Sequence, residues 1–359
     1  MVAPGPRLLL IGFDGLDYEL LKKRNSSDIR LLPLLAPIPA TGPSWTSMYT
    51  GDSMATHNIR DVFGLEFRRR YSRNDFLHIM LWHWHNLGRV LRRLPPRQRH
   101  ATYETTSSKY LWDTLSQAGV KMKMVNMPIT SPVRPINGVY VGGFPVILRK
   151  KWYYPDTLEK VVPPDYFEIT DMIQWFSDPE MHSHRFWKKS SLNLGVDEVM
   201  RRLEKGVFKL VDFFLSLPSA DLEMIQFSFI DRLGHVFEMT EDIEQRGYEL
   251  VAKVMDRIIS EVNPQSTIIV SDHGFQITGH TELGCLGLRG ELAEKVICPP
   301  DYTPCVLDVA PTLASFLGAK HDCEGNDLTV AGEYVTRGSA EEQAEKEKMM
   351  QNLKDLGYL

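Results

Sequence analysis

The stretch TIIVSDHGF, Thr267 to Phe275, organises the rest of this sequence. Its first part, Thr267–Val270, is a short β-branched run, as expected for a buried strand. The run stops at Asp272 and His273, whose polar side chains cannot continue an apolar strand. In open α/β sheets ligands bind just outside the carboxyl ends of the strands, and this end carries two metal-ligand types side by side. An ordinary polar turn would have the same composition, so recurrence of the pattern elsewhere decides between the two.

The pattern recurs twice. Near the start, the apolar run Leu8–Phe13 is a second buried strand, and it breaks at Asp14 before a helical segment. Asp14 alone could be a helix N-cap, which is a common role for aspartate. A third strand, within EMIQFSFIDRLGHVF, leads to Asp231, and His235 follows four residues later. If a helical turn begins there, positions i and i+4 share a face, so these two side chains could bind one ion.

The segment ATGPSWTSMYTG, Ala40–Gly51, predicts a helix with a hydroxyl at its N-terminal end. Pro43 suits the first turn of a helix, which puts Thr41 at the mouth of that helix. A hydroxyl there faces unpaired backbone N–H groups and the positive end of the helix dipole, and together these favour an anion. A threonine that only caps the helix would occupy the same position.

Composition bounds the class of protein. The chain has 359 residues, a formal net charge of -5, 43% apolar residues and 24% charged residues, which is typical of a globular protein. The negative charge argues against general nucleic-acid binding. The apolar run Leu8–Phe13 is too short for a signal-peptide core or a membrane span, so the simplest expectation is a cytoplasmic enzyme. The four cysteines form no CxxC pair and are expected to be reduced: Cys285, Cys298, Cys305 and Cys323.

Residues 63–100 differ from the rest in charge. They hold nine arginines, no lysine and two acids, which gives a formal +7 in an acidic protein. Arginine binds anions through a bidentate fork, so this insertion is predicted to bind an anionic part of a substrate. A solvated face or a partner surface is the alternative. The substrate-binding candidates are Arg68, Arg69, Arg70, Arg92 and Arg93.

The remaining segments complete the predicted division of the chain. Residues 139–195 are rich in Pro, Trp and Tyr and predict an irregular cap. Residues 336–359 contain a capping-box pattern from Ser339 to Glu342 and predict a charged helical tail. The catalytic core is then formed by residues 1–62, 101–138 and 196–335.

Three aspartates, three histidines and one hydroxyl thus gather at strand or helix ends. Three carboxylates along one sheet edge repel one another unless cations neutralise them. Mixed oxygen and nitrogen ligands favour zinc or manganese over calcium. Two such ions suit in-line phosphoryl displacement. The candidate residues are Asp14, Thr41, Asp231, His235, Asp272, His273 and His280.

Taken in order, these segments resemble the alkaline phosphatase superfamily, and most closely its type I phosphodiesterase/nucleotide pyrophosphatase family. The similarity runs from residue 8 to about residue 318. It implies an α/β fold, a three-layer α/β/α sandwich with a central, mostly parallel sheet and an inserted cap. The motifs that carry it are GFDGL at Asp14, TGPSWTSMYTG followed by His57, IDRLGH, SDHGF, His280 before Gly284–Gly287, and DVAPTL.

The resemblance also implies roles for individual residues. Asp14, Thr41, Asp272 and His273 would hold one metal ion, and Asp231, His235 and His280 would hold the other. Thr41 would be the nucleophile, forming a phosphothreonine that water then hydrolyses. The cofactors expected are two zinc ions, with manganese as the alternative.

Two departures from the family patterns limit the substrate. Nucleotide-cleaving members have a phosphate-binding asparagine about twenty residues after the nucleophile, where this chain has Arg60-Asp61-Val62 and nothing nearer than Asn58. Sulfatases need a C/S-x-P-x-R pattern, which Thr41–Trp45 lacks. We therefore expect a hydrolase of small phosphoric esters, with a diester preferred. A phosphomonoesterase, a phosphonate hydrolase or a phosphotransferase could use the same site, and a binding protein without activity could keep the same fold.

Overall fold

The computed structural model describes most of the predicted core. The Arg-rich insertion, including Arg68, Arg69, Arg70, Arg92 and Arg93, lies outside the described residues, as does nearly all of the C-terminal tail. The predictions made for those two segments therefore stay predictions. The described residues are 5–24, 28–59, 106, 108–144, 151–166, 195–237, 239–277, 279–336 and 347.

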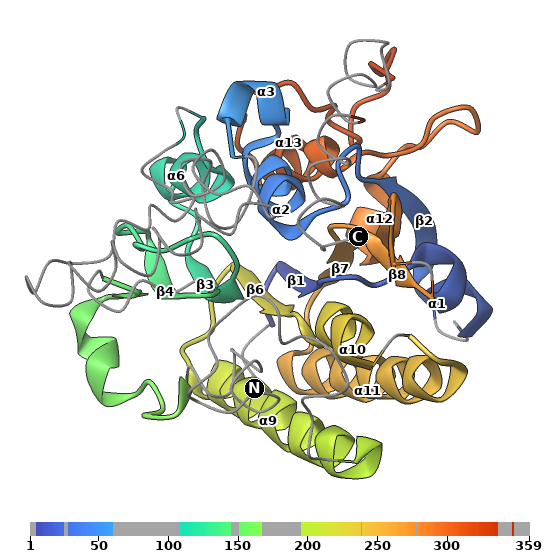
Figure 1. Ribbon diagram of the computed structural model, residues 1–359. Coiled ribbons are helices and arrows are strands. Elements are labelled where there is room, and N and C mark those ends of the chain that lie inside the picture. Colours follow the sequence, from blue (N-terminus) through green and yellow to red (C-terminus); the bar gives the residue numbers. More distant parts are fainter. Residues whose placement is uncertain are drawn as a thin grey trace, which may run out of the picture.

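An eight-stranded sheet forms the centre of the molecule, with strand order β2-β10-β7-β1-β6-β3-β4-β5 (Figure 1). Strands β7, β1, β6, β3 and β4 run parallel to their neighbours among these five. Strand β10 is antiparallel to both β7 and β2, and β5 is antiparallel to β4. The strands are β1 Leu8–Phe13, β2 Arg30–Leu35, β3 Met122–Met127, β4 Gly138–Gly142, β5 Tyr153–Tyr154, β6 Leu222–Phe227, β7 Ser266–Ser271 and β10 Leu283–Gly290.

Helices cover both faces of the sheet. Helices α1, α9, α10 and α11 pack on one face, and α2, α6, α12 and α13 pack on the other (Figure 1). The helices are α1 Tyr18–Arg24, α2 Thr41–Thr50, α3 Met54–His57, α6 Leu111–Gln117, α9 Val196–Ser216, α10 Phe229–Phe237, α11 Glu241–Val262, α12 Glu291–Lys295 and α13 Val309–Phe316. Short 3-10 turns lie at Asp156–Lys160 and Val306–Asp308, and a two-stranded ribbon is formed by β8 Gly274–Gln276 and β9 Gly279–Thr281.

Strand β1 shows how the two cores are separated. Leu9, Ile11 and Phe13 belong to the core under α9 and α11, whereas Leu8 and Leu10 belong to the core under α2 and α13. Successive side chains of a strand point to opposite faces, so a strand covered on both sides is apolar throughout. The predicted three-layer α/β/α fold with a mostly parallel sheet is confirmed.

The predicted start of the cap at residue 139 falls inside strand β4. Residues 138–142 pair with β3, and Tyr153–Tyr154 pair with β4, so this part of the chain extends the central sheet. Strand β4 reads GVYVG and β5 has two residues, which is too little pattern to distinguish a strand from an irregular loop.

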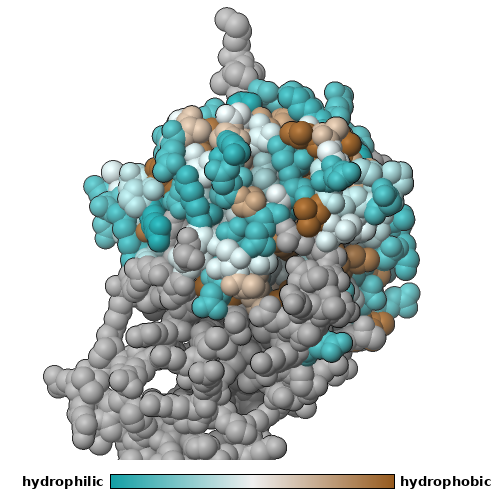
Figure 2. All heavy atoms as spheres, turned by 90° about the horizontal axis from the view of Figure 1, so that it is seen from above, coloured by the Kyte–Doolittle hydropathy of each residue, from teal (hydrophilic) through white to brown (hydrophobic). Residues whose placement is uncertain are grey.

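The surface and the cysteines are unexceptional where the structure describes them. In the coloured part of Figure 2, apolar residues are scattered among hydrophilic ones. Among the described residues, the large apolar side chains that are exposed are Val161, Ile277, Ile297, Val330 and Val335. None of the described helices has the length and apolar character needed to cross a membrane. All four cysteines are free.

Candidate active site

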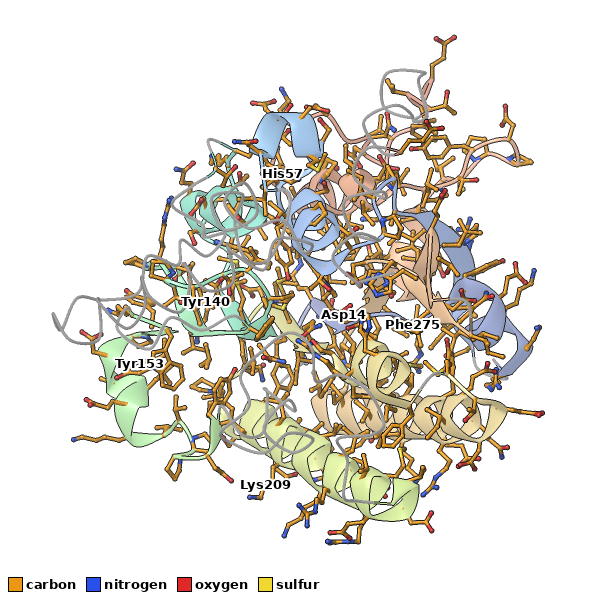
Figure 3. All side chains as sticks on the ribbon, in the orientation of Figure 1. Asp14, His57, Tyr140, Tyr153, Lys209 and Phe275 are labelled. Atoms are coloured by element: carbon orange, nitrogen blue, oxygen red, sulfur yellow. The ribbon has the colours of Figure 1, made fainter. Side chains whose placement is uncertain are left out.

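Three neighbouring strands of the sheet end level with one another. Phe13 of β1 pairs with Phe227 of β6 on one side and with Ser271 of β7 on the other. Asp14 and Asp272 follow these residues directly and therefore lie side by side at the carboxyl edge. Figure 3 labels Asp14 near the middle of the molecule, where this edge lies between α2 and α10.

Helix α10 places the third carboxylate at the same edge. It begins two residues after β6, and Asp231 lies in its first turn, where its N–H donates to the Asp14 carbonyl at 3.1 Å. Gly15 makes this approach possible. Its φ is +80°, and an added Cβ would lie 3.0 Å from the Asp231 nitrogen. The Gly15 N–H also points to Asp272 Oδ1 at 3.4 Å, so the loop after β1 joins the two other strand ends.

The first cluster contains Asp14, Asp272, His273 and Thr41. His273 Nε2 lies 3.2 Å from Asp14 Oδ1 and 3.4 Å from Asp272 Oδ2, and all three side chains are buried. Thr41 is the first residue of α2, and its Oγ1 lies 3.3 Å from Asp14 Oδ2. The Thr41 hydroxyl therefore contacts the cluster, in addition to any role at the helix end.

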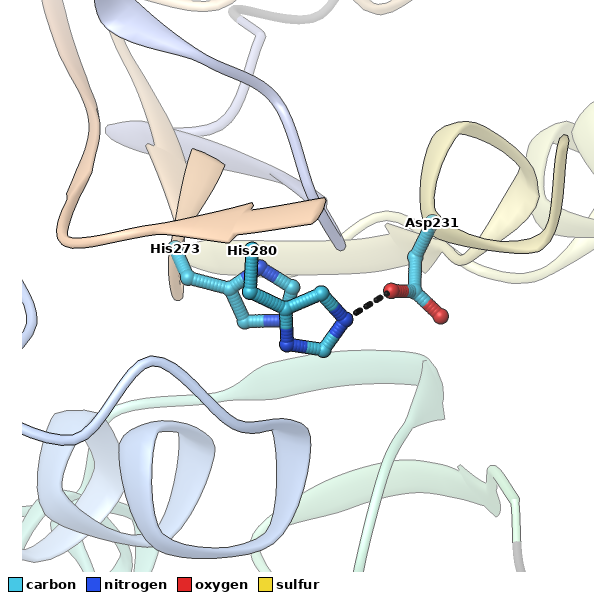
Figure 4. Close-up of side chains that lie close together, drawn as sticks. All are labelled: Asp231, His273 and His280. Carbon is cyan, nitrogen blue, oxygen red and sulfur yellow. Dashed lines mark ion pairs between the residues drawn. The ribbon is translucent and has the colours of Figure 1, made fainter. Parts of the chain in front are cut away.

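The second cluster contains Asp231, His235 and His280. Asp231 Oδ1 lies 3.2 Å from His235 Nε2 and 3.1 Å from His280 Nε2, and the two Nε2 atoms are 3.0 Å apart. The rings of His280 and His273 stack with centroids 4.2 Å apart, so the two clusters touch (Figure 4). The structure thus brings together all seven side chains that the sequence suggested.

Main-chain carbonyls determine which ring nitrogen carries the proton. His280 Nδ1 lies 2.9 Å from the Pro39 carbonyl, and His273 Nδ1 lies 3.1 Å from the Gly274 carbonyl. A carbonyl can only accept, so Nδ1 donates, and each ring, when neutral, holds its lone pair on Nε2. Those lone pairs face carboxylate oxygens, which are also acceptors.

Facing acceptors leave buried polar atoms unsatisfied. Asp231 Oδ1, Asp272 Oδ2 and His273 Nε2 are buried and have no hydrogen-bond partner. Unpaired buried polar atoms are rare and costly, and a shared cation would satisfy all three. Two sets of side chains bring their possible ligand atoms within 4.8 Å of one another. One set is Asp14, Asp272 and His273, and the other is Asp231, His273 and His280. Carboxylate oxygens with imidazole nitrogens fit a divalent ion such as zinc or manganese.

The pKa values of the buried side chains also indicate an excess of negative charge at this site. Burial and the neighbouring Asp14 carboxylate raise the pKa of Asp272 well above its usual range. Burial alone would lower the pKa of His273, but the Asp272 and Asp14 carboxylates raise it to about 10. Burial would likewise raise the pKa of Asp231, yet His235 and His280 hold it well below its usual range. The carboxylates therefore need positive charge beside them.

Ser47 of α2 and His57 of α3 form a serine–histidine pair, but the contacts of His57 do not activate the serine as a nucleophile. Ser47 Oγ lies 3.0 Å from His57 Nε2, but His57 Nδ1 accepts the Ile59 N–H at 3.0 Å. The ring proton is then on Nε2, so His57 donates to Ser47 and cannot take its proton. His57 is fully buried and contacts helix α2 through Ser47.

Sequence reasoning missed the groups that orient the imidazoles. The carbonyls of Pro39 and Gly274 belong to the main chain, so no residue type signals them. It also missed Asp17, a buried carboxylate three residues after Asp14 that contacts the β8–β9 ribbon. Its only signal was its position in the GFDGLD segment, where it reads as a helix cap.

Comparisons with known proteins identify the family of the chain. The family model "Type I phosphodiesterase / nucleotide pyrophosphatase" matches residues 8–283. A comparison with curated protein sequences found no match.

Three solved structures illustrate the similarity of fold. The phosphonate monoester hydrolase of Agrobacterium radiobacter has a TM-score of 0.48 and 12% identity, over 95% of this chain and 82% of that one. A putative sulfatase from Bacteroides thetaiotaomicron has a TM-score of 0.47 and 14% identity, over 93% and 76%. Human ectonucleotide pyrophosphatase / phosphodiesterase 5 has a TM-score of 0.37 and 14% identity, over 75% and 57%.

Proposed function

The chain belongs to the type I phosphodiesterase / nucleotide pyrophosphatase family and is a hydrolase of phosphoric esters, and we propose that it uses two divalent ions and a Thr41 nucleophile. The observation that carries this proposal is the set of buried acceptor atoms that face one another without a partner, Asp231 Oδ1, Asp272 Oδ2 and His273 Nε2. A set of groups that is unsatisfied without a cation and complete with one is a binding site for that cation.

Two groups of side chains would hold the ions. One group is Asp14, Thr41, Asp272 and His273, and the other is Asp231, His235 and His280. We propose zinc, with manganese as the alternative, because both accept mixed oxygen and nitrogen ligands. When bound, such ions stabilise the negative charge of the phosphoryl oxygens and make a hydroxyl group more acidic.

In this proposal Thr41 attacks phosphorus. Its Oγ1 would form a bond to phosphorus while the ester P–O bond breaks and the alcohol leaves. Water then attacks the phosphothreonine and releases the Thr41 hydroxyl with phosphate or a phosphate monoester. Asp14 Oδ2, 3.3 Å from Thr41 Oγ1, can accept the hydroxyl hydrogen bond and so direct an Oγ1 lone pair toward the substrate.

The N-terminal end of α2 favours an anion beside Thr41. The helix is ten residues long, and Ala40 at its N-cap has no side chain that could occupy the free N–H groups. These N–H groups and the positive end of the helix dipole attract a phosphate group. Because a nucleotide-type asparagine is missing from the expected place, we propose a small phosphodiester without assigning a nucleotide.

Substitution of Thr41 tests this function. Thr41→Ala should retain metal and fold but lose turnover of an aryl phosphodiester by about a thousand-fold or more, as for other covalent nucleophiles. Thr41→Ser, which keeps a hydroxyl, should retain part of the activity. Ser44→Ala is the matched control, because Ser44 lies on the same helix and its hydroxyl donates to the Ile38 carbonyl.

The reaction is followed with the zinc-loaded protein, and metal content is measured by elemental analysis. Thr41→Ala activity within tenfold of wild type would reject Thr41 as the nucleophile. A wild-type protein that retains no metal, and gains no activity with added zinc or manganese, would reject the two-metal site.

A further inference from the structure

Asp17 is a buried carboxylate outside the proposed ligand groups. It lies just before α1 and is 1% exposed. Its Oδ1 accepts the Leu20 N–H at 3.1 Å, which is the usual role of aspartate at a helix N-terminus. Its Oδ2 accepts from Gln276 Nε2 at 2.9 Å and from Thr281 Oγ1 at 2.8 Å. A simple cap needs only the first of these three bonds.

The two Oδ2 contacts reach both strands of the β8–β9 ribbon. Gln276 ends β8 and Thr281 ends β9, and each strand has three residues. A two-stranded ribbon of this length is marginal by itself and needs contacts with the rest of the molecule. The packing there is tight, because a Cβ on Gly274 would lie 2.4 Å from Asp17 Oδ2 and 2.2 Å from Thr281 Oγ1.

The ribbon carries one histidine of the metal clusters and follows another. His280 pairs with Phe275 across the ribbon and precedes Thr281, and His273 precedes Gly274, the first residue of β8. His280 belongs to the second cluster, and its ring is otherwise oriented by the Pro39 carbonyl. The position of the His280 main chain therefore depends on what holds Thr281.

We propose that Asp17 is a positioning residue that fixes His280 through the β8–β9 ribbon and so determines the metal affinity of the second cluster. The inference rests on the proposed two-metal function. Hydrogen bonds to a charged acceptor are among the stronger ones, and a metal site tolerates only about half an ångström of ligand displacement. Loss of an outer contact to a ligating residue typically lowers metal affinity 10- to 100-fold.

Two variants separate this role from helix capping. Thr281→Val keeps the size of the side chain and removes the hydroxyl that donates to Oδ2, while the cap of α1 stays intact. Asp17→Asn keeps the shape, but an amide has one acceptor oxygen and cannot accept from Leu20, Gln276 and Thr281 together. Tyr248→Phe is the control, because the Tyr248 hydroxyl accepts the Asp17 N–H at 3.0 Å and so contacts the main chain of Asp17 rather than its carboxylate.

The experiment is a competitive zinc titration of the chelator-treated full chain, with His235→Ala as a reference that identifies the step of the second cluster. Asp17→Asn and Thr281→Val should weaken that step about 10- to 100-fold and leave the other step within a few-fold. Saturating zinc should restore most of the kcat of Thr281→Val. Amide hydrogen exchange across residues 274–281 of the metal-free protein should be faster in both variants and unchanged in Tyr248→Phe.

Each contrary result has a distinct meaning. Wild-type zinc affinity and ribbon exchange in Thr281→Val would overturn the role of Asp17 and leave the proposed function intact, even if Asp17→Asn did not fold. An equal effect of Tyr248→Phe would show a general loosening of the loop after β1 and would also overturn it. A wild-type protein that binds neither zinc nor manganese would overturn the proposed function itself.

Discussion

Buried charged side chains lie at the amino ends and at the carboxyl ends of the central strands, and the two groups differ in how their charge is balanced. At the amino edge, Lys123 of β3 and Glu223 of β6 are register partners, 3% and 1% exposed, with an Nζ–Oε2 distance of 2.6 Å. At the carboxyl edge, Asp231, Asp272 and His273 keep buried atoms without a hydrogen-bond partner.

The amino-edge pair is neutral within the protein, because the Lys123 ammonium lies beside Glu223 Oε2, although this oxygen also accepts no hydrogen bond of good geometry. Glu223 Oε1 accepts from Ser219 Oγ at 2.8 Å and from the Ala220 N–H at 3.1 Å. The Lys123 ammonium lies 4.2 Å from the centre of the Phe214 ring and 3.4 Å from the Phe214 carbonyl. Buried charges that balance inside the chain are structural, whereas a set of three buried carboxylates with unpartnered ligand atoms is suited to a cation from outside.

The largest expected effect comes from removing a ligand at the carboxyl edge. Asp272→Asn should reduce turnover by about ten-thousand-fold, equivalent to about 5 kcal/mol, and should lose the ion shared with Asp14 and His273. His235→Ala should lose the other ion. Crystals of each variant soaked in zinc should show one remaining site, and loss of the same site in both would contradict the division of ligands.

The same substitution should have the opposite effect on the metal-free protein. Burial and Asp14 already disfavour the charge on Asp272, so Asp272→Asn should raise the free energy of unfolding of the chelated chain. Glu223→Gln should instead lower it by about 3 to 5 kcal/mol, because it leaves Lys123 buried without its partner. Urea unfolding of both variants measures these two changes in the free energy of unfolding. Changes of the same sign would contradict the difference between the two groups of buried charges.

A smaller effect is expected from His57, a third buried group with internal partners. Burial lowers its pKa to about 4, so the folded protein keeps it neutral while the unfolded chain binds a proton below pH 6.5. The free energy of unfolding should therefore fall by about 3 kcal/mol from this group as the pH drops from 6.5 to 4. His57→Gln cannot titrate and should lose this part of the pH dependence in chelated protein. An unchanged pH profile would show that His57 is not buried as a neutral ring.

The smallest effect is expected at the surface. Lys253 of α11 and Glu204 of α9 form an ion pair of 2.7 Å, and both side chains are exposed by more than two fifths. Lys253→Met should change the free energy of unfolding by less than about 1 kcal/mol, and the change should shrink as salt rises. A larger loss in the free energy of unfolding, unaffected by salt, would show that this exposed ion pair stabilises the fold more than a surface pair should.

Local patterns predicted the buried strands and suggested which side chains to examine, and the resemblance of the ordered motifs to a known family implied the fold class. Leu8–Phe13 and Ile268–Val270 are apolar because helices cover both faces of a parallel sheet. The aspartates follow at the strand ends, where a polar group can meet a ligand. The i, i+4 spacing of Asp231 and His235 needs only a helical turn, which the sequence predicts by itself. The suggested division of these side chains between two ions, and the role of Thr41, stay predictions until metal is measured.

The tertiary structure decided what no local pattern carries. The membership of β4 in the sheet depends on its neighbour β3, which sequence periodicity does not report. The ring protons of His273 and His280 depend on carbonyls that every residue type has. Gln276, which donates to the second oxygen of Asp17, is 259 residues away from it along the chain, and Glu223 is 100 residues away from Lys123. Such pairs are recognised only when packing brings them together. Side-chain type determines which interactions are possible, and the packed backbone determines which of them form.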